Sequence, residues 1–149
     1  MPGIIVGIDG SDRSRQALEW AVNEAAVRHA PLTVLTVSEA LAGGYWGGPV
    51  YPGDLDRAKQ AQGAAQVETD KALEQAGNGR MPASVTVRAV TGVPAEELLR
   101  ASAGADMIVV GSRGAGGFKR LLLGSVSTHI THHARCPVVV IPPDNTRPA

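Results

Sequence analysis

A glycine-rich stretch at residues 111–125, GSRGAGGFKRLLLGS, has the residue types of a phosphate-binding loop. It contains five glycines, two arginines, one lysine and no acidic residue. Gly111 and Gly114 lack a Cβ atom, so a ligand can lie close to their backbone. Gly124 and Ser125 open a predicted helix, whose first N–H groups and dipole attract anions. Composition alone leaves two interpretations open, a phosphate cradle and a flexible connection.

The same stretch does not match the standard nucleotide-binding motifs. It lacks the G-x-x-x-x-G-K-[ST] pattern, and no G-x-G-x-x-G follows the first apolar run of the chain. Gly116 and Gly117 let the loop wrap, and Arg113, Lys119 and Arg120 supply positive charge. The choice between cradle and connection therefore depends on where the fold places the stretch.

Three histidines could ligate a metal ion. His129, His132 and His133 recur at i, i+3 and i+4, just before Cys136. Polar or cationic groups also suit the last turns of a helix, and the chain has neither an H-E-x-x-H pattern nor a second cysteine. We therefore predict no metal site. A single cysteine also means no intrachain disulfide, which fits a reducing compartment.

The elements that must position these residues alternate along the chain. Apolar and β-branched runs predict five strands, at residues 3–8, 32–38, 84–90, 106–111 and 136–142. Helical spacing, caps and prolines predict four helices, at residues 11–30, 54–76, 94–103 and 125–134. Such alternation predicts an α/β fold with a parallel sheet and helices on both faces.

The position of the glycine-rich stretch follows from this order. Right-handed crossovers and a reversal of winding after the third strand give a doubly wound five-stranded sheet, order 3-2-1-4-5. Strands one and four are then neighbours, and ligands bind at that switch point beyond the carboxyl ends of the strands. Those ends carry Asp9-Gly10-Ser11 and Gly111-Ser112-Arg113-Gly114. This placement favours a ligand site, although Asp9-Gly10 alone is also a common turn.

Two further segments keep alternative interpretations. The stretch 43–53, GGYWGGPVYPG, contains three of the five aromatic residues, and is predicted either as a plain surface loop or as a lid or partner contact. The last strand is apolar and lies at a sheet edge, which is a liability unless it is covered. The C-terminal tail or a second chain could cover it.

The bulk properties fit one globular domain. We predict a single domain over residues 1–149, with an ordered core at about 3–142 and a loose tail at 143–149. Basic and acidic residues balance at 14 each, which argues against nucleic acid or an anionic membrane as a partner. The N-terminus lacks a signal-peptide pattern, and no apolar window approaches the about 18 residues of a membrane span. The expectation is a soluble, cytoplasmic protein.

From Gly3 to about Pro142 the chain resembles a single-domain universal stress protein. The resemblance rests on VGIDGS after the first strand, on the pattern G-x-x-G-x9-G-S at residues 111–125, and on CPVVVIP at residues 136–142. The long pattern marks the ATP-binding branch of that family, and here it is complete. The resemblance implies a Rossmann-like fold that binds ATP, with Mg²⁺ on its phosphates.

The resemblance also implies roles for individual residues. Asp9 would hold the ribose hydroxyls, Val37 would meet adenine through its backbone, and the start of the last helix would hold the phosphates. The implied cofactor-binding residues are Gly7, Ile8, Asp9, Gly10, Ser11, Val37, Val110, Gly111, Ser112, Arg113, Gly114, Gly116, Gly117, Gly124, Ser125 and Val126.

The function implied is that of a nucleotide-dependent sensor or regulator in stress response. A homodimer through the last strand and an unknown regulatory protein partner are implied as well; the strand residues are Val138, Val139, Val140 and Ile141. No general base is evident for the γ-phosphate, so we do not predict an enzyme. The alternatives are a protein-interaction module that works without nucleotide and a slow ATPase.

Overall fold

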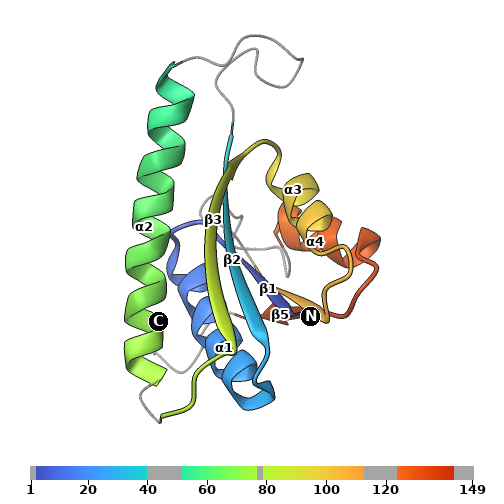
Figure 1. Cartoon of the computed structure of the whole chain (residues 1–149). Coiled ribbons are helices and arrows are strands. Elements are labelled where there is room, and N and C mark those ends of the chain that lie inside the picture. Colours follow the sequence, from blue (N-terminus) through green and yellow to red (C-terminus); the bar gives the residue numbers. More distant parts are fainter. Residues whose placement is uncertain (1–2, 40–51, 77–78, 113–123, 143–149) are drawn as a thin grey trace, which may run out of the picture.

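The computed structural model describes residues 3–39, 52–76, 79–112 and 124–142 (Figure 1). It contains one parallel sheet of five strands in the order β3-β2-β1-β4-β5. The strands are β1 (Ile4–Ile8), β2 (Pro31–Ser38), β3 (Ser84–Thr91), β4 (Met107–Gly111) and β5 (Val138–Ile141). The helices are α1 (Asp12–Arg28), α2 (Pro52–Ala76), α3 (Pro94–Ala101) and α4 (Ser125–His133). The predicted doubly wound α/β fold, including its strand order, is confirmed.

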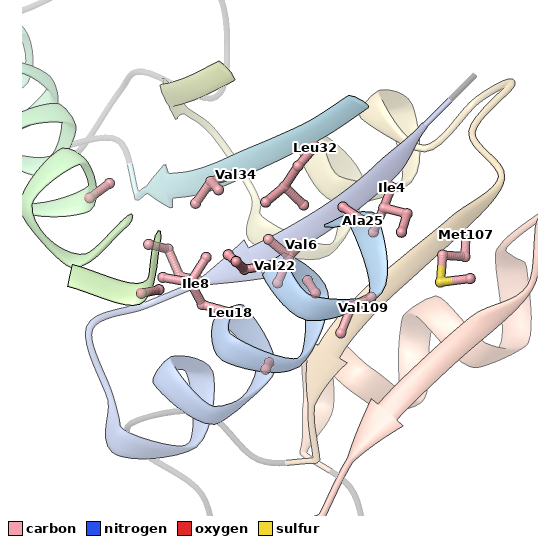
Figure 2. Packing of buried hydrophobic residues seen from close by; sticks show 14 residues of the cluster. Ile4, Val6, Ile8, Leu18, Val22, Ala25, Leu32, Val34, Met107 and Val109 are labelled. Carbon is pink, nitrogen blue, oxygen red and sulfur yellow. The ribbon is translucent and has the colours of Figure 1, made fainter. Parts of the chain in front are cut away.

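Helices cover both faces of the sheet (Figure 1). The face under α1 and α2 buries Val6 of β1 together with Leu18 and Val22 of α1 (Figure 2). The opposite face, under α3 and α4, buries Ile5 of β1 and Leu98 of α3 in a second cluster. Successive β1 side chains point to opposite faces, as strand geometry requires. A fully buried aliphatic side chain of this kind contributes about 1.5–3 kcal/mol.

Strand register fixes the neighbours at the switch point. Ile4, Ile5 and Val6 of β1 pair with Met107, Ile108 and Val109 of β4. The two strands run in parallel, so both carboxyl ends lie at the same edge of the sheet. The segments that follow β1 and β4 therefore start side by side.

Most elements begin or end one or two residues away from their predicted bounds, and two of these differences have a clear local cause. Helix α1 ends at Arg28, two residues early, because His29 takes a left-handed conformation with φ 51°. Helix α2 starts at Pro52, inside the stretch predicted as loop. Proline suits this position, since the first N–H groups of a helix have no intrahelical partner. In the part of the chain that the structure describes, none of the helices is both long and apolar enough to cross a bilayer.

Candidate functional site

The loop after β1 is a hydrogen-bonded turn that caps α1. Oδ1 of Asp9 accepts hydrogen bonds from the backbone N–H of Ser11 at 2.9 Å and from its hydroxyl at 2.5 Å. The Ser11 hydroxyl in turn accepts from the N–H of Ser14 at 3.2 Å, as an N-cap does. Gly10 has φ 84°, a left-handed conformation that glycine adopts without strain. The turn interpretation of Asp9-Gly10 is therefore correct locally, and the exposed carboxylate still lies at the switch point.

Ser14 is part of this turn although the sequence prediction passed over it. Its hydroxyl accepts from the backbone N–H of Asp9 at 3.1 Å and donates to the carbonyl of Ser11 at 3.1 Å. The side chain is buried. The spacing of two serines by three residues at a helix start was the available signal, since an N-cap residue pairs with the third helical position. Ser14 thus holds the backbone of Asp9 in place.

The loop after β4 is anchored through the backbone of Ser112. Its N–H donates to the carbonyl of Ile141 in β5 at 2.9 Å. Its carbonyl accepts from the N–H of Gly124 at 2.5 Å and from the hydroxyl of Ser127 at 2.9 Å. Ser127 is 2% exposed and also donates to the carbonyl of Gly124. These bonds hold the start of α4 against the end of β4, and the prediction had not included Ser127.

The side chain of Ser112 differs from the others at this edge. It is 2% exposed, yet its hydroxyl has no hydrogen-bond partner among the described residues. A buried polar group without a partner costs free energy, so each case needs an explanation. The adjoining start of α4 also lacks a side-chain cap, because its N-cap residue is Gly124, and its first turn contains no acidic residue. Unpaired donors near a helix N-terminus suit an anion.

The predicted site residues on β1 and β2 have different surroundings in the fold. A Cβ atom on Gly7 would lie 2.8 Å from a methyl carbon of Leu98, so the packing of α3 explains the glycine. Ile8 is buried on the opposite face, within the cluster under α1 and α2. Val37 is half-buried and pairs with Val90 near the carboxyl end of β2. The side chains of Ile8 and Val37 thus belong to the two hydrophobic clusters, on opposite faces of the sheet.

The remaining predicted residues divide into two groups. Val110 is buried, and Gly111 is the last residue of β4, where it pairs with Ile141 rather than adopting a positive φ. Ser125 and Val126 form the first turn of α4. Outside the described residues lie Arg113, Gly114, Gly116 and Gly117, along with most of the aromatic stretch 43–53.

The three histidines of α4 are exposed on its last turns. The rings of His129 and His133 lie 4.5 Å apart between centroids, and those of His132 and His133 lie 6.5 Å apart. Within the four described ranges, no three or more His, Cys, Asp or Glu side chains come together as a metal site would require. Cys136 is half-buried and packs at the margin of the second cluster.

A family model and curated relatives both match this chain, and they indicate the same family. The model of the universal stress protein family matches residues 2–142. A universal stress protein of Mycolicibacterium smegmatis is 35% identical over 147 residues, which make up 96% of this chain and 49% of the relative. The chain thus spans about half the length of the curated relatives it matches.

Solved structures give the same result for the fold. The universal stress protein UspA from Lactobacillus plantarum superposes with a TM-score of 0.73 at 25% identity, covering 94% of this chain and 97% of that one. The universal stress protein from Archaeoglobus fulgidus, solved in complex with dAMP, superposes with a TM-score of 0.65 at 25% identity. That comparison covers 95% of this chain and 98% of the other.

Proposed function

Because the chain belongs to the universal stress protein family, we propose that it binds ATP where β1 and β4 end and acts as a nucleotide-dependent regulator in stress response. One observation carries the proposal: the hydroxyl of Ser112, beside the uncapped start of α4, is buried and has no hydrogen-bond partner among the described residues. A phosphate oxygen is an acceptor that would satisfy the hydroxyl and the helix N–H groups together.

The residues present fit an adenine nucleotide. The hydroxyls of Ser112 and Ser125 and the first N–H groups of α4 would hold phosphates. The exposed carboxylate of Asp9, on the neighbouring strand end, would accept from the ribose hydroxyls. Backbone groups of Val37 would meet adenine. A Mg²⁺ ion would reside mainly on the phosphates and neutralise their charge.

The known relative supports the class of ligand. The Archaeoglobus fulgidus protein was solved with dAMP, which has the base and sugar-phosphate unit that the proposed pocket would hold. ATP rather than a monophosphate is our proposal for this chain, because G-x-x-G-x9-G-S is complete at residues 111–125. The glycines in the middle of that pattern would surround the outer phosphates.

We propose a homodimer in the cytoplasm, formed by one domain per chain that joins through β5. All four residues of β5 are apolar and half-buried, and among the described strands β5 pairs with β4 alone. An apolar edge strand of this kind can pair with the same strand of a second copy. A regulatory protein partner would then read the nucleotide state of the pair.

Two measurements on the purified chain test the nucleotide proposal. Mass spectrometry of small molecules released on denaturation should detect ATP, and thermal denaturation should shift upward with ATP and Mg²⁺. The variant Gly111→Val should lose the shift because it fills the end of β4, whereas Gly63→Ala on α2 should keep it. Equal shifts in Gly111→Val and the parent would place the nucleotide elsewhere.

The same experiments separate the alternatives. Absence of both released nucleotide and thermal shift would favour an interaction module that works without nucleotide. Phosphate release that follows the folded protein through purification and falls in Ser125→Ala would favour a slow ATPase. Release that persists in Gly111→Val would indicate a contaminating enzyme.

A further inference from the structure

The sheet has two edge strands, β3 and β5, and the chain treats them differently. An edge strand presents a row of backbone N–H and C=O groups that point away from the sheet. A strand from another chain can pair with such a row and extend the sheet. Natural proteins therefore obstruct the edges that must stay free.

Gln62 of α2 bonds to the outer backbone groups of β3. Its side-chain nitrogen donates to the carbonyl of Val87 at 2.7 Å, and its side-chain oxygen accepts from the N–H of Ala89 at 2.7 Å. Val87 and Ala89 are two residues apart, so these groups point in the same direction, and the bonds to Gln62 occupy them outside the ladder with β2. A carboxamide has the donor and acceptor of a peptide unit. Gln62 thus makes the pair of bonds that a sixth strand would make.

The surroundings of Gln62 reinforce this obstruction. Helix α2 packs along β3 (Figure 1). The two residues that bond to the amide, Val87 and Ala89, lie at the middle of the strand Ser84–Thr91. The residue between the two bonded positions, Arg88, is exposed, and a charged side chain on an edge strand opposes pairing. Ser84 and Thr86, earlier in the strand, are exposed polar residues.

The β5 edge has no counterpart of Gln62 among the described residues. The outer backbone groups of β5 receive no hydrogen bond from a described side chain, and its four side chains are apolar. The bonds at the two ends of β5 run inward, from Ile108 to the carbonyl of Pro137 and from Ser112 to the carbonyl of Ile141. The two edges therefore differ in their openness to a partner strand.

We infer that Gln62 closes the β3 edge to strand addition, so that a second copy of this chain can extend the sheet at β5 only. The inference concerns β3 and holds with or without bound nucleotide. It assigns an assembly role to a glutamine whose position on a polar helix gives no hint of one. Its partner class is an extended strand of another copy.

The test uses the full chain with Gln62→Met, which keeps the length of the side chain and removes both hydrogen bonds. Gln66→Ala is the matched control, because Gln66 lies one turn further on α2 and, among the residues that the structure describes, bonds to the side chain of Asp70 and not to β3. Sedimentation velocity from micromolar to near-millimolar concentration gives the assembly state. Amide hydrogen exchange at Ala89 reports on the β3 edge.

We expect the parent and Gln66→Ala to share one assembly state at every concentration. Gln62→Met should add larger species that grow with concentration. Its Ala89 amide should exchange at least about tenfold faster when dilute, the factor that a lost hydrogen bond of ordinary strength gives. Protection of that amide should return as the larger species form, since β3 would then pair with another chain.

Two results would overturn the inference. One is a folded Gln62→Met whose Ala89 amide is exposed but whose assembly state equals that of the parent. The other is association without renewed protection at Ala89, which would place the new contact elsewhere. If Gln62→Met does not fold, Gln62→Ala is measured against the same two criteria, and failure of both variants to fold would make Gln62 a stability residue and reject the assembly role.

Discussion

Replacing Ser112 by alanine should stabilise the ligand-free protein while weakening its affinity for ATP. The hydroxyl is buried and has no partner in the described part of the chain, and an unsatisfied group of this kind costs about 1–3 kcal/mol. Alanine removes the hydroxyl and leaves a void of one oxygen atom, so we expect a net gain of about 1 kcal/mol. For a chain of this length that gain raises the melting temperature by about 3 °C.

Bound ATP should offset the stability that Ser112→Ala gains in the ligand-free protein. ATP at a hundred times its dissociation constant stabilises a protein by about 2.7 kcal/mol. Loss of one hydrogen bond to a charged phosphate weakens binding about tenfold or more, which reduces that stabilisation to about 1.4 kcal/mol. With ATP and Mg²⁺, the melting temperatures of Ser112→Ala and the parent should therefore differ by no more than about 1 °C. Without them, the melting temperature of Ser112→Ala should be about 3 °C higher.

Ser127→Ala is the matched control for this experiment. Ser127 is equally buried, but its one hydroxyl proton is shared between two carbonyl acceptors, at Ser112 and Gly124. Its loss should destabilise the ligand-free protein by about 1 kcal/mol. Differential scanning fluorimetry on the three proteins, with and without ATP, gives all the values. If Ser112→Ala lowers the melting temperature as Ser127→Ala does, and its ATP shift equals that of the parent, then the unpaired hydroxyl does not face the nucleotide.

Further substitutions test the packing and the helix cap by urea denaturation, and a last one tests the ribose contact by scanning fluorimetry. Gly7→Ala should lower the free energy of unfolding by about 1–3 kcal/mol, because its Cβ atom would overlap Leu98. Gly63→Ala, on the open face of α2, should raise it by about 0.5–1 kcal/mol. Equal effects of the two variants would contradict the packing argument. Ser11→Ala should cost about 0.5–2 kcal/mol through loss of the α1 cap, and a neutral result would show that another group caps the helix. Asp9→Ala should remove the ATP-induced thermal shift in scanning fluorimetry, and a shift equal to that of the parent would exclude Asp9 from the ribose site.

The fold could be predicted because its determinants are local. Apolar runs, helix caps and prolines each act within a few residues, and their alternation limits the sheet to a small number of arrangements. The positions of Asp9 and Ser112 at neighbouring strand ends followed from strand order alone. Prediction failed for the start of α2, where Pro52 was taken for a loop residue although it suits a first helical turn.

The tertiary hydrogen bonds could not be predicted in this way. Ser127 and Gln62 are unremarkable in sequence, and their partners lie 15 and 25 residues away along the chain. Such bonds depend on the packing of a helix against a strand, which periodicity does not specify. The unpaired state of the Ser112 hydroxyl is equally invisible in the sequence, because it depends on what surrounding residues fail to offer.

The bonds from Gly124 and Ser127 to the carbonyl of Ser112 have a consequence for evolution. They join the last residue before the segment 113–123 to the first residues after it, so the ends of that segment are fixed by the framework. Lengthening a segment with fixed ends changes its closure entropy only logarithmically. A change in the length of that segment should therefore cost little closure entropy, while the start of α4 stays joined to the end of β4 through Ser112. The framework and the segment between its fixed ends can therefore evolve at different rates.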